Sequence, residues 1–260
     1  MIEHSRDKTV SYYYDSHPTE EDLMGETTLH HVSIVYLEEV LKWLFRGQIC
    51  SVQVNLNFYV TNDEMEYPIA PDIAVIKGVP YREEISWRVG ITGPAPQVVF
   101  EFASDKTWKR DLDEKPLTYA QMGVLEYYAF DPYDPPLPLS RRKGGRLFGW
   151  QRNAITRPLQ KVLPELDGRL WSPQLRSWLK ADGKYLRLYD LLWNRRLTEI
   201  EVETAVRQAE AERAEREAAR ATREAARAQA AIQQLQVEAA RAQALAEKLR
   251  ALGIDPDQPL

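Results

Sequence analysis

Residues 97–104, QVVFEFAS, place a carboxylate inside a run of apolar residues. The β-branched and aromatic residues of this segment predict a buried strand with Glu101 near its centre. A charge in such a strand costs several kcal/mol unless a cation, a proton or a metal ion compensates it. Glu101 is therefore the first residue of the chain for which we expect a chemical role.

A second carboxylate, Asp72, begins the apolar segment 72–78 directly after Pro71. If this segment and residues 97–104 form neighbouring strands, Asp72 and Glu101 can converge at the edge of a sheet. Two close carboxylates repel each other, so the pKa of one rises unless a cation joins them. A hard divalent cation with oxygen ligands satisfies both, and the lack of a nearby Cys or His at ligand spacing favours magnesium or manganese over zinc.

A lysine follows the strand at a distance that could bring it back to the carboxylates. With Asp113 as helix cap and Pro116 in the first turn, Lys115 is expected at the start of a helix near the strand end. An ammonium there can orient an attacking water or stabilise charge on a phosphate. A non-catalytic account explains these residues equally well. In it, Glu101 forms a buried ion pair with Lys115 or Lys109 and takes no part in catalysis.

Several further polar groups have plain structural explanations. His30 and His31 begin the first predicted helix, where packing or surface exposure explains them better than metal binding. Glu26 could reach the site from that helix, but a surface or capping role is the simpler interpretation. The basic residues of segment 141–146, RRKGGR, are explained equally well by contacts to phosphates and by a solvated turn.

The elements that must position these residues can be predicted from hydrophobic periodicity. Apolar residues at helical spacing predict an amphipathic helix over 31–45, and a second helix is expected over 117–123, closed by Gly123. Alternation predicts one half-buried strand over 49–60. Further strands are expected over residues 72–78, 97–104, 125–132, 147–151, 168–172 and 184–189.

The composition changes abruptly near Ile200, where Gly, Pro and aromatic residues disappear until Gly253. The Ala-, Glu-, Arg- and Gln-rich sequence predicts a long helix, and Ala or larger apolar residues recur in steps of three and four from Ala211 to Leu249. This heptad pattern predicts a coiled coil. Because the seam is mostly alanine and its flanking positions carry glutamate without a facing basic residue, we expect weak self-association or a different helical partner.

Composition and charge argue against a generally basic, a disulfide-stabilised or a membrane-spanning protein. The net charge of −5 argues against a generally basic surface but allows a local basic patch. The single cysteine, Cys50, excludes an intrachain disulfide framework and a cysteine zinc cluster, which fits a reducing compartment. The N-terminal residues show no signal-peptide pattern, and the apolar helix candidate is too short and too charged to span a bilayer. We therefore expect a cytoplasmic protein without a membrane segment.

The combination of motifs resembles the Uma2 family of restriction-endonuclease-like proteins, which belongs to the PD-(D/E)XK nuclease superfamily. The resemblance runs from about Glu26 to Trp193. The motifs that carry it are Pro71–Asp72, Glu101 followed by Ser104, the spaced pair Asp111 and Lys115, and the GV-EYY-DP run from Gly123 to Pro132.

The resemblance implies an α/β fold with a mixed central β-sheet flanked by helices. The expected organisation is an N-terminal arm over 1–25, a nuclease-fold domain over 26–195 and a helical coiled-coil tail over 200–252. It also implies a magnesium site formed by Asp72 and Glu101, with manganese as a possible substitute, and hydrolysis of nucleic-acid phosphodiester bonds, with DNA as the first choice of substrate. Lys115 matches the family's catalytic lysine.

One position departs from the superfamily pattern, which usually has a lysine two residues after the glutamate. Here that residue is Ala103, so Lys115 would supply the ammonium from a different backbone position. Two hypotheses follow. The chain is a magnesium-dependent endonuclease with Asp72, Glu101 and Lys115 as catalytic residues, or it is an inactive nuclease-fold protein that recruits partners through its tail.

Overall fold

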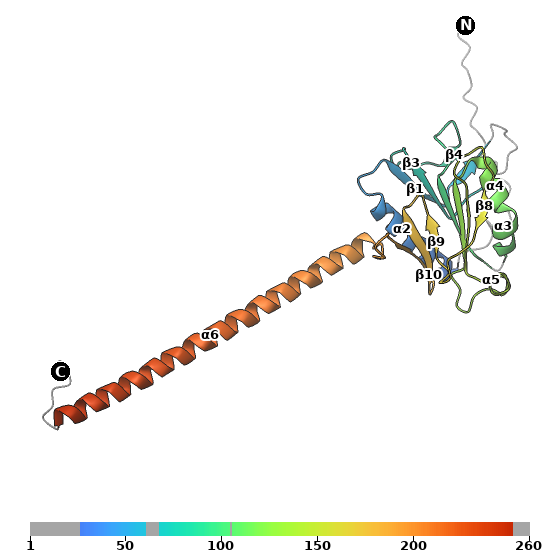
Figure 1. Ribbon diagram of the computed structural model, residues 1–260. Helices are drawn as coiled ribbons and strands as arrows, with labels where there is room; N and C mark the ends of the chain where they lie inside the picture. The colour runs from blue at the N-terminus through green and yellow to red at the C-terminus, as the bar shows by residue number, and fades with distance from the viewer. Residues whose placement is uncertain (1–26, 61–67, 105, 252–260) are drawn as a thin grey trace, which may run out of the picture. The chain divides into compact units, whose positions relative to one another are not determined.

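The computed structural model describes residues 27–60, 68–104 and 106–251 (Figure 1). The arm expected over 1–25 and the candidate Glu26 lie outside these ranges. The chain divides into two compact units between Glu199 and Ile200. The first unit contains all the strands, and the second contains most of one long helix.

A six-stranded sheet forms the centre of the first unit. The strands lie in the order β1-β3-β5-β6-β7-β8, and β5 and β6 pair in parallel while all other neighbours pair antiparallel. The mixed sheet, its flanking helices and the long C-terminal helix confirm the predicted α/β fold class. The strands are β1 (Cys50–Val54), β3 (Ile73–Lys77), β5 (Val98–Phe102), β6 (Glu126–Phe130), β7 (Leu147–Gln151) and β8 (Gln160–Val162).

Two hydrophobic clusters cover the two faces of this sheet. Helix α2 (Thr28–Leu44) packs on one face with Phe100 and Phe102 of β5. Helices α3 (Trp108–Asp113) and α4 (Lys115–Met122) lie on the other face with Val99 (Figure 1). Because side chains alternate along a strand, Glu101 must point toward the face of α3 and α4.

Smaller elements complete the first unit. The second sheet, in the order β11-β10-β9, adds leucines to the α2 side of the core. A parallel pair of short strands, β2 with β4, and a short helix, α5, lie elsewhere in the unit. Their bounds are β2 (Asn57–Tyr59), β4 (Ser86–Arg88), α5 (Pro138–Lys143), β9 (Leu170–Ser172), β10 (Ser177–Asp182) and β11 (Tyr185–Tyr189).

The single strand predicted over 49–60 is wrong, because the chain breaks at Asn55. This residue has a φ of 49°, in the left-handed region that Asn tolerates better than most residues. The break changes the alternation of side chains between the faces. Val52 packs in the cluster on the α2 side, whereas Leu56 and Phe58 pack in the cluster on the opposite face.

The start of α4 also differs in detail from the prediction. Asp113 is the last residue of α3 and not a cap, and the N-cap position of α4 is Glu114, whose side chain makes no capping hydrogen bond. The predicted location of Lys115 is nevertheless correct, since it is the first residue of α4. Gly123 ends the helix with a φ of 105°, as its sequence position predicts.

The second unit is dominated by α6 (Glu199–Ala251), a continuous helix of 53 residues with no buried side chain. Ion pairs along it join residues four apart, as in Glu212–Arg216 at 3.3 Å and Arg220–Glu224 at 2.9 Å. The long helix is therefore present, while its pairing with another chain stays a prediction. No helix within the described ranges is long and apolar enough to cross a membrane.

Candidate active site

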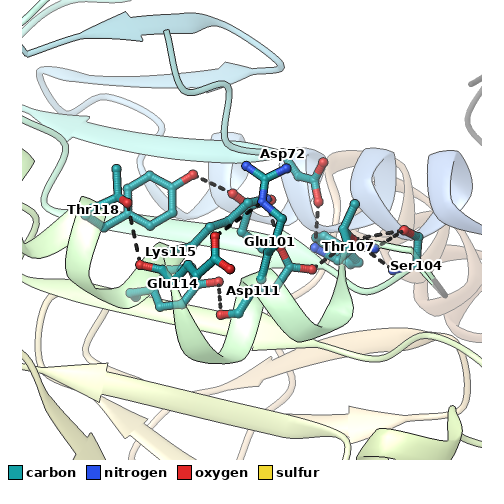
Figure 2. Close-up of polar contacts among 12 residues, drawn as sticks. Asp72, Glu101, Ser104, Thr107, Asp111, Glu114, Lys115 and Thr118 are labelled. Carbon is teal, nitrogen blue, oxygen red and sulfur yellow. Dashed lines mark hydrogen bonds and ion pairs between the residues drawn. The ribbon is translucent and has the colours of Figure 1, made fainter. Parts of the chain in front are cut away.

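The pairing of β3 with β5 brings the two predicted carboxylates together. Ile73 lies opposite Phe100 in this antiparallel pair, so Asp72, one residue before β3, lies at the level of Glu101. Asp72 Oδ2 accepts a hydrogen bond of 2.5 Å from the backbone N–H of Phe102. Figure 2 shows Asp72 beside Glu101 at this end of the sheet.

Glu101 is buried, with only 3% of its side chain exposed. Its Oε1 accepts a hydrogen bond from the hydroxyl of Tyr119 on α4. Its Oε2 lies 3.0 Å from Lys115 Nζ. Protein groups therefore contact both carboxylate oxygens.

Lys115 places its ammonium between two carboxylates (Figure 2). Its Nζ lies 3.0 Å from Glu101 Oε2 and 2.8 Å from Asp111 Oδ1, with Asp111 one helical turn earlier. The ion pair required by the non-catalytic account is thus present, and its cation is Lys115. Lys109 instead lines a cavity between α3 and α5.

Asp111 is a site residue that the sequence reasoning recognised only as part of a family motif. It is fully buried, and its Oδ2 accepts a hydrogen bond of 2.9 Å from the Thr107 hydroxyl. Its Oδ1 lies close to the Lys115 ammonium but accepts no well-directed hydrogen bond from any described residue. The four-residue spacing of Asp111 and Lys115 was the available signal, because it places both side chains on one helical face.

His30 is the second residue whose position differs from the expectation. Its Nε2 lies 3.3 Å from Asp72 Oδ2, so the start of α2 contacts the site directly. The two residues are 42 positions apart, and no local pattern indicates the contact. The side chain is 14% exposed, which places it at the rim of the site.

The cluster holds more negative than positive charge. If Asp72, Glu101, Asp111 and Lys115 are all ionised, three carboxylates face one ammonium and the formal net charge is −2. Burial, with smaller contributions from Asp72 and Asp111, raises the pKa of Glu101 to about 8 against the opposing effects of the Lys115 ammonium and the Tyr119 hydrogen bond. Burial likewise raises the pKa of Asp111, against the effect of Lys115.

The lysine itself stays protonated. Burial alone would favour the neutral amine, but Glu101, Asp111 and Asp72 together raise the pKa of Lys115 above its usual range. Lys115 is therefore a permanent cation and not a general base. It can stabilise negative charge or orient a water molecule.

The donor set fits a hard divalent cation held by few ligands. The oxygen donors are carboxylates, with the His30 imidazole 3.3 Å from Asp72 Oδ2, and when all three carboxylates are ionised one divalent charge would neutralise the excess of −2. Within the described ranges no group of three or more His, Cys, Asp or Glu side chains is placed so that it could hold a metal ion. Magnesium commonly binds through one or two carboxylates with waters and substrate phosphates, and Asp72 and Glu101 are the residues that could hold it in that way.

Two comparisons with known proteins found proteins similar to this chain. The family model Uma2, described as "Putative restriction endonuclease", matches residues 18–176. A solved structure described as a "putative nuclease belonging to DUF820 from Anabaena variabilis ATCC 29413" is 15% identical, with a TM-score of 0.40. The alignment covers 58% of this chain and 76% of that one. No curated protein matches the chain.

The electrostatics of Glu101 predict a pH-dependent effect of Glu101→Gln on metal-free protein. The pKa of Glu101 in the folded protein is about 8, above the ordinary value of 4.5. The neutral carboxyl therefore contributes its full free energy of stabilisation below pH 4.5. This contribution is lost as the pH rises through 8. Glutamine mimics the neutral form. The variant should therefore gain stability over wild type across this window, by at most about 1.4 kcal/mol per pH unit. Thermal or urea unfolding in EDTA measures it.

Glu114→Gln is the matched control, because it removes an exposed carboxylate between α3 and α4. Its stability should equal that of wild type at every pH. If Glu101→Gln is instead much less stable than wild type at pH 8, the Glu101–Lys115 ion pair is a structural element and the non-catalytic account holds.

Proposed function

The chain belongs to the Uma2 family, and on that premise we propose that it is a divalent-metal-dependent endonuclease acting on nucleic-acid phosphodiester bonds. The observation that carries the proposal is the gathering of Asp72, Glu101 and Lys115 at one end of the central sheet. DNA is the substrate we put first. A cytoplasmic location, suggested by the single Cys50, belongs to the same proposal.

Asp72 and Glu101 would hold the cation, with magnesium as the first choice and manganese as the substitute. Asp72 is fixed for this task by the backbone N–H of Phe102, which leaves Oδ1 and further lone pairs for a ligand. When bound, the cation supplies Lewis acidity toward a phosphate oxygen and toward the attacking water. Glu101 must give up the proton that burial favours, so the site is best prepared at neutral to alkaline pH.

Lys115 would act as an electrostatic and positioning group. Its ammonium has three N–H donors, and among the described residues two carboxylates, those of Glu101 and Asp111, lie within ion-pair distance of it. The third N–H can donate to a water or to a phosphate oxygen on which charge develops. Ala103 is fully buried on the same face of the sheet as Glu101, and the ammonium comes from α4 instead.

The alternative function is that of an inactive nuclease-fold protein that recruits partners through α6. Two observations favour it: protein groups already engage both oxygens of Glu101, and Ala103 replaces the usual lysine. Under this alternative the Glu101–Lys115 pair only stabilises the fold. Cleavage assays separate the two functions.

Plasmid cleavage should require Mg²⁺ or Mn²⁺, stop in EDTA and fail to recover with Zn²⁺. Lys115→Met should lower the cleavage rate about 100- to 1,000-fold, the range for loss of one donor to a developing oxyanion. Metal affinity, measured by calorimetry, should be retained. Lys42→Met is the control, since Lys42 also pairs with carboxylates, Glu38 and Glu39, but at an exposed position of α2. Undiminished cleavage in EDTA, or a fully active Lys115→Met protein, would contradict the mechanism.

We also propose that α6 self-associates weakly and serves as a spacer or a partner-binding helix. Ile232 and Leu235, the strongest apolar side chains of the predicted seam, are 55% and 66% exposed in the single chain. Most other seam positions are alanine, which buries much less apolar surface than leucine, at about 0.8 kcal/mol per methylene.

Sedimentation equilibrium of the full chain should show a monomer at nanomolar concentration. Replacing four seam alanines by leucine should convert it to a dimer, which makes the variant a positive control: Ala218→Leu, Ala221→Leu, Ala225→Leu and Ala228→Leu. A wild-type dimer that persists at nanomolar concentration, and is lost when the chain ends at Glu199, would show that the alanine seam is a strong interface.

A further inference from the structure

A cavity of about 690 Å³ lies between α3 and α5. The buried side chains of Trp108 and Leu137 contribute apolar surface to it. Its charged lining consists of exposed residues, Lys109 and Asp113 from α3 and Arg142 and Lys143 from α5. The cavity is a second feature of α3, distinct from the carboxylate cluster.

Helix α3 presents different faces to the two features. Lys109 and Asp113 are four residues apart and therefore lie on one face. Asp111 lies about 200° around the helix from Lys109, at 100° per residue, and contacts Lys115. The cavity and the cluster are thus on opposite sides of one short helix.

The charge of the cavity is positive although the protein is acidic. Three cationic side chains face one carboxylate, and the chain as a whole carries −5. Lys143 and Asp113 are 3.9 Å apart and half exposed, which is a weak ion pair. Within the described residues, neither Lys109 nor Arg142 forms an ion pair with a carboxylate. The cavity therefore has cationic groups available for an anion.

A fixed scaffold holds these basic residues. Trp108 Nε1 donates a hydrogen bond of 2.7 Å to Ser140 Oγ, which ties α5 to α3 across the cavity. The Asp131 carboxylate accepts the backbone N–H of Leu137 at 2.7 Å, just before α5 begins. Because these contacts fix α5, the basic side chains can bind an anion without ordering a loose loop.

The location suits a phosphate chain that also reaches the cluster. A helix with its side chains is about 10–12 Å across, so the cavity and the cluster residue Asp111 are separated by about the width of α3. Successive phosphates of one DNA strand rise about 3.4 Å along the helix axis. A strand with a phosphate at the cluster could therefore place a nearby phosphate of the same strand at the cavity.

We propose that this cavity binds backbone phosphates of nucleic acid through Lys109, Arg142 and Lys143, flanking the bond that is cleaved. The inference rests on the proposed nuclease function for the position of the substrate. Contacts of this kind fix the register of the strand but read no sequence. Asp113 weakens the site by repelling the same phosphates.

Fluorescence anisotropy with a labelled DNA duplex in EDTA tests the proposal without turnover. Lys109→Ala and Arg142→Ala should each weaken binding several-fold and lower the slope of log affinity against log salt by about 0.9. Arg141→Ala, at an exposed position of α5 outside the lining, is the matched control and should leave affinity and slope near wild type. Asp113→Asn should tighten binding, a change of sign that a merely structural role would not produce.

Equal effects of Arg141→Ala and Arg142→Ala, or no binding by wild type, would overturn the proposal. Stronger competition by polyglutamate than by unlabelled DNA at equal charge would overturn it as well, in favour of an acidic protein partner. Because binding is measured without the cation, failure of the two functions can be told apart. If the cavity variants weaken DNA binding but wild type does not cleave DNA in Mg²⁺, the phosphate-binding cavity is supported and the nuclease function is contradicted. If wild type cleaves DNA but the cavity variants bind it as wild type does, the nuclease function is supported and the phosphate-binding cavity is contradicted.

Discussion

The Lys115 ammonium, buried between Glu101 and Asp111, is the interaction on which the rest of the first unit depends. It joins β5 to α3 and α4 and compensates charge that the core could not otherwise hold. Removing the ammonium would leave Glu101 and Asp111 buried without their cation, a loss that typically costs about 3–5 kcal/mol. Three nearby carboxylates face this one cation, and we propose that the imbalance favours binding of a further positive charge.

Helix α3 contributes residues both to the buried carboxylate cluster and to the basic cavity at the surface. On one face α3 carries Asp111 toward the buried lysine, and on another it carries Lys109 toward the basic cavity. Tyr119 on α4 and the Phe102 amide of β5 fix the two carboxylates expected to bind metal. The proposed chemistry and the proposed substrate contacts therefore depend on the same α3–α4 packing against β5.

The sequence predicts much of this arrangement where the pattern is local. Glu101 stands out because a charge interrupts an apolar strand, and Lys115 falls at a helix start that Pro116 favours. Asp111 and His30 escaped assignment for different reasons. The burial of Asp111 depends on how α3 packs, and the contact of His30 with Asp72 spans 42 residues. The break at Asn55 was missed because alternation continues through it in the sequence, although the backbone turns there.

We propose that Asp72 and Glu101, within this excess of carboxylate, bind one divalent cation. Electron paramagnetic resonance titration of the full chain with Mn²⁺ tests it directly, with Asp72→Asn as the variant and Glu114→Gln as the control. The account predicts one Mn²⁺ bound per chain, a loss of affinity of more than about 10-fold in Asp72→Asn, and no change in the control. Equal Mn²⁺ affinity of wild type and Asp72→Asn, or no bound Mn²⁺ at all, would contradict it.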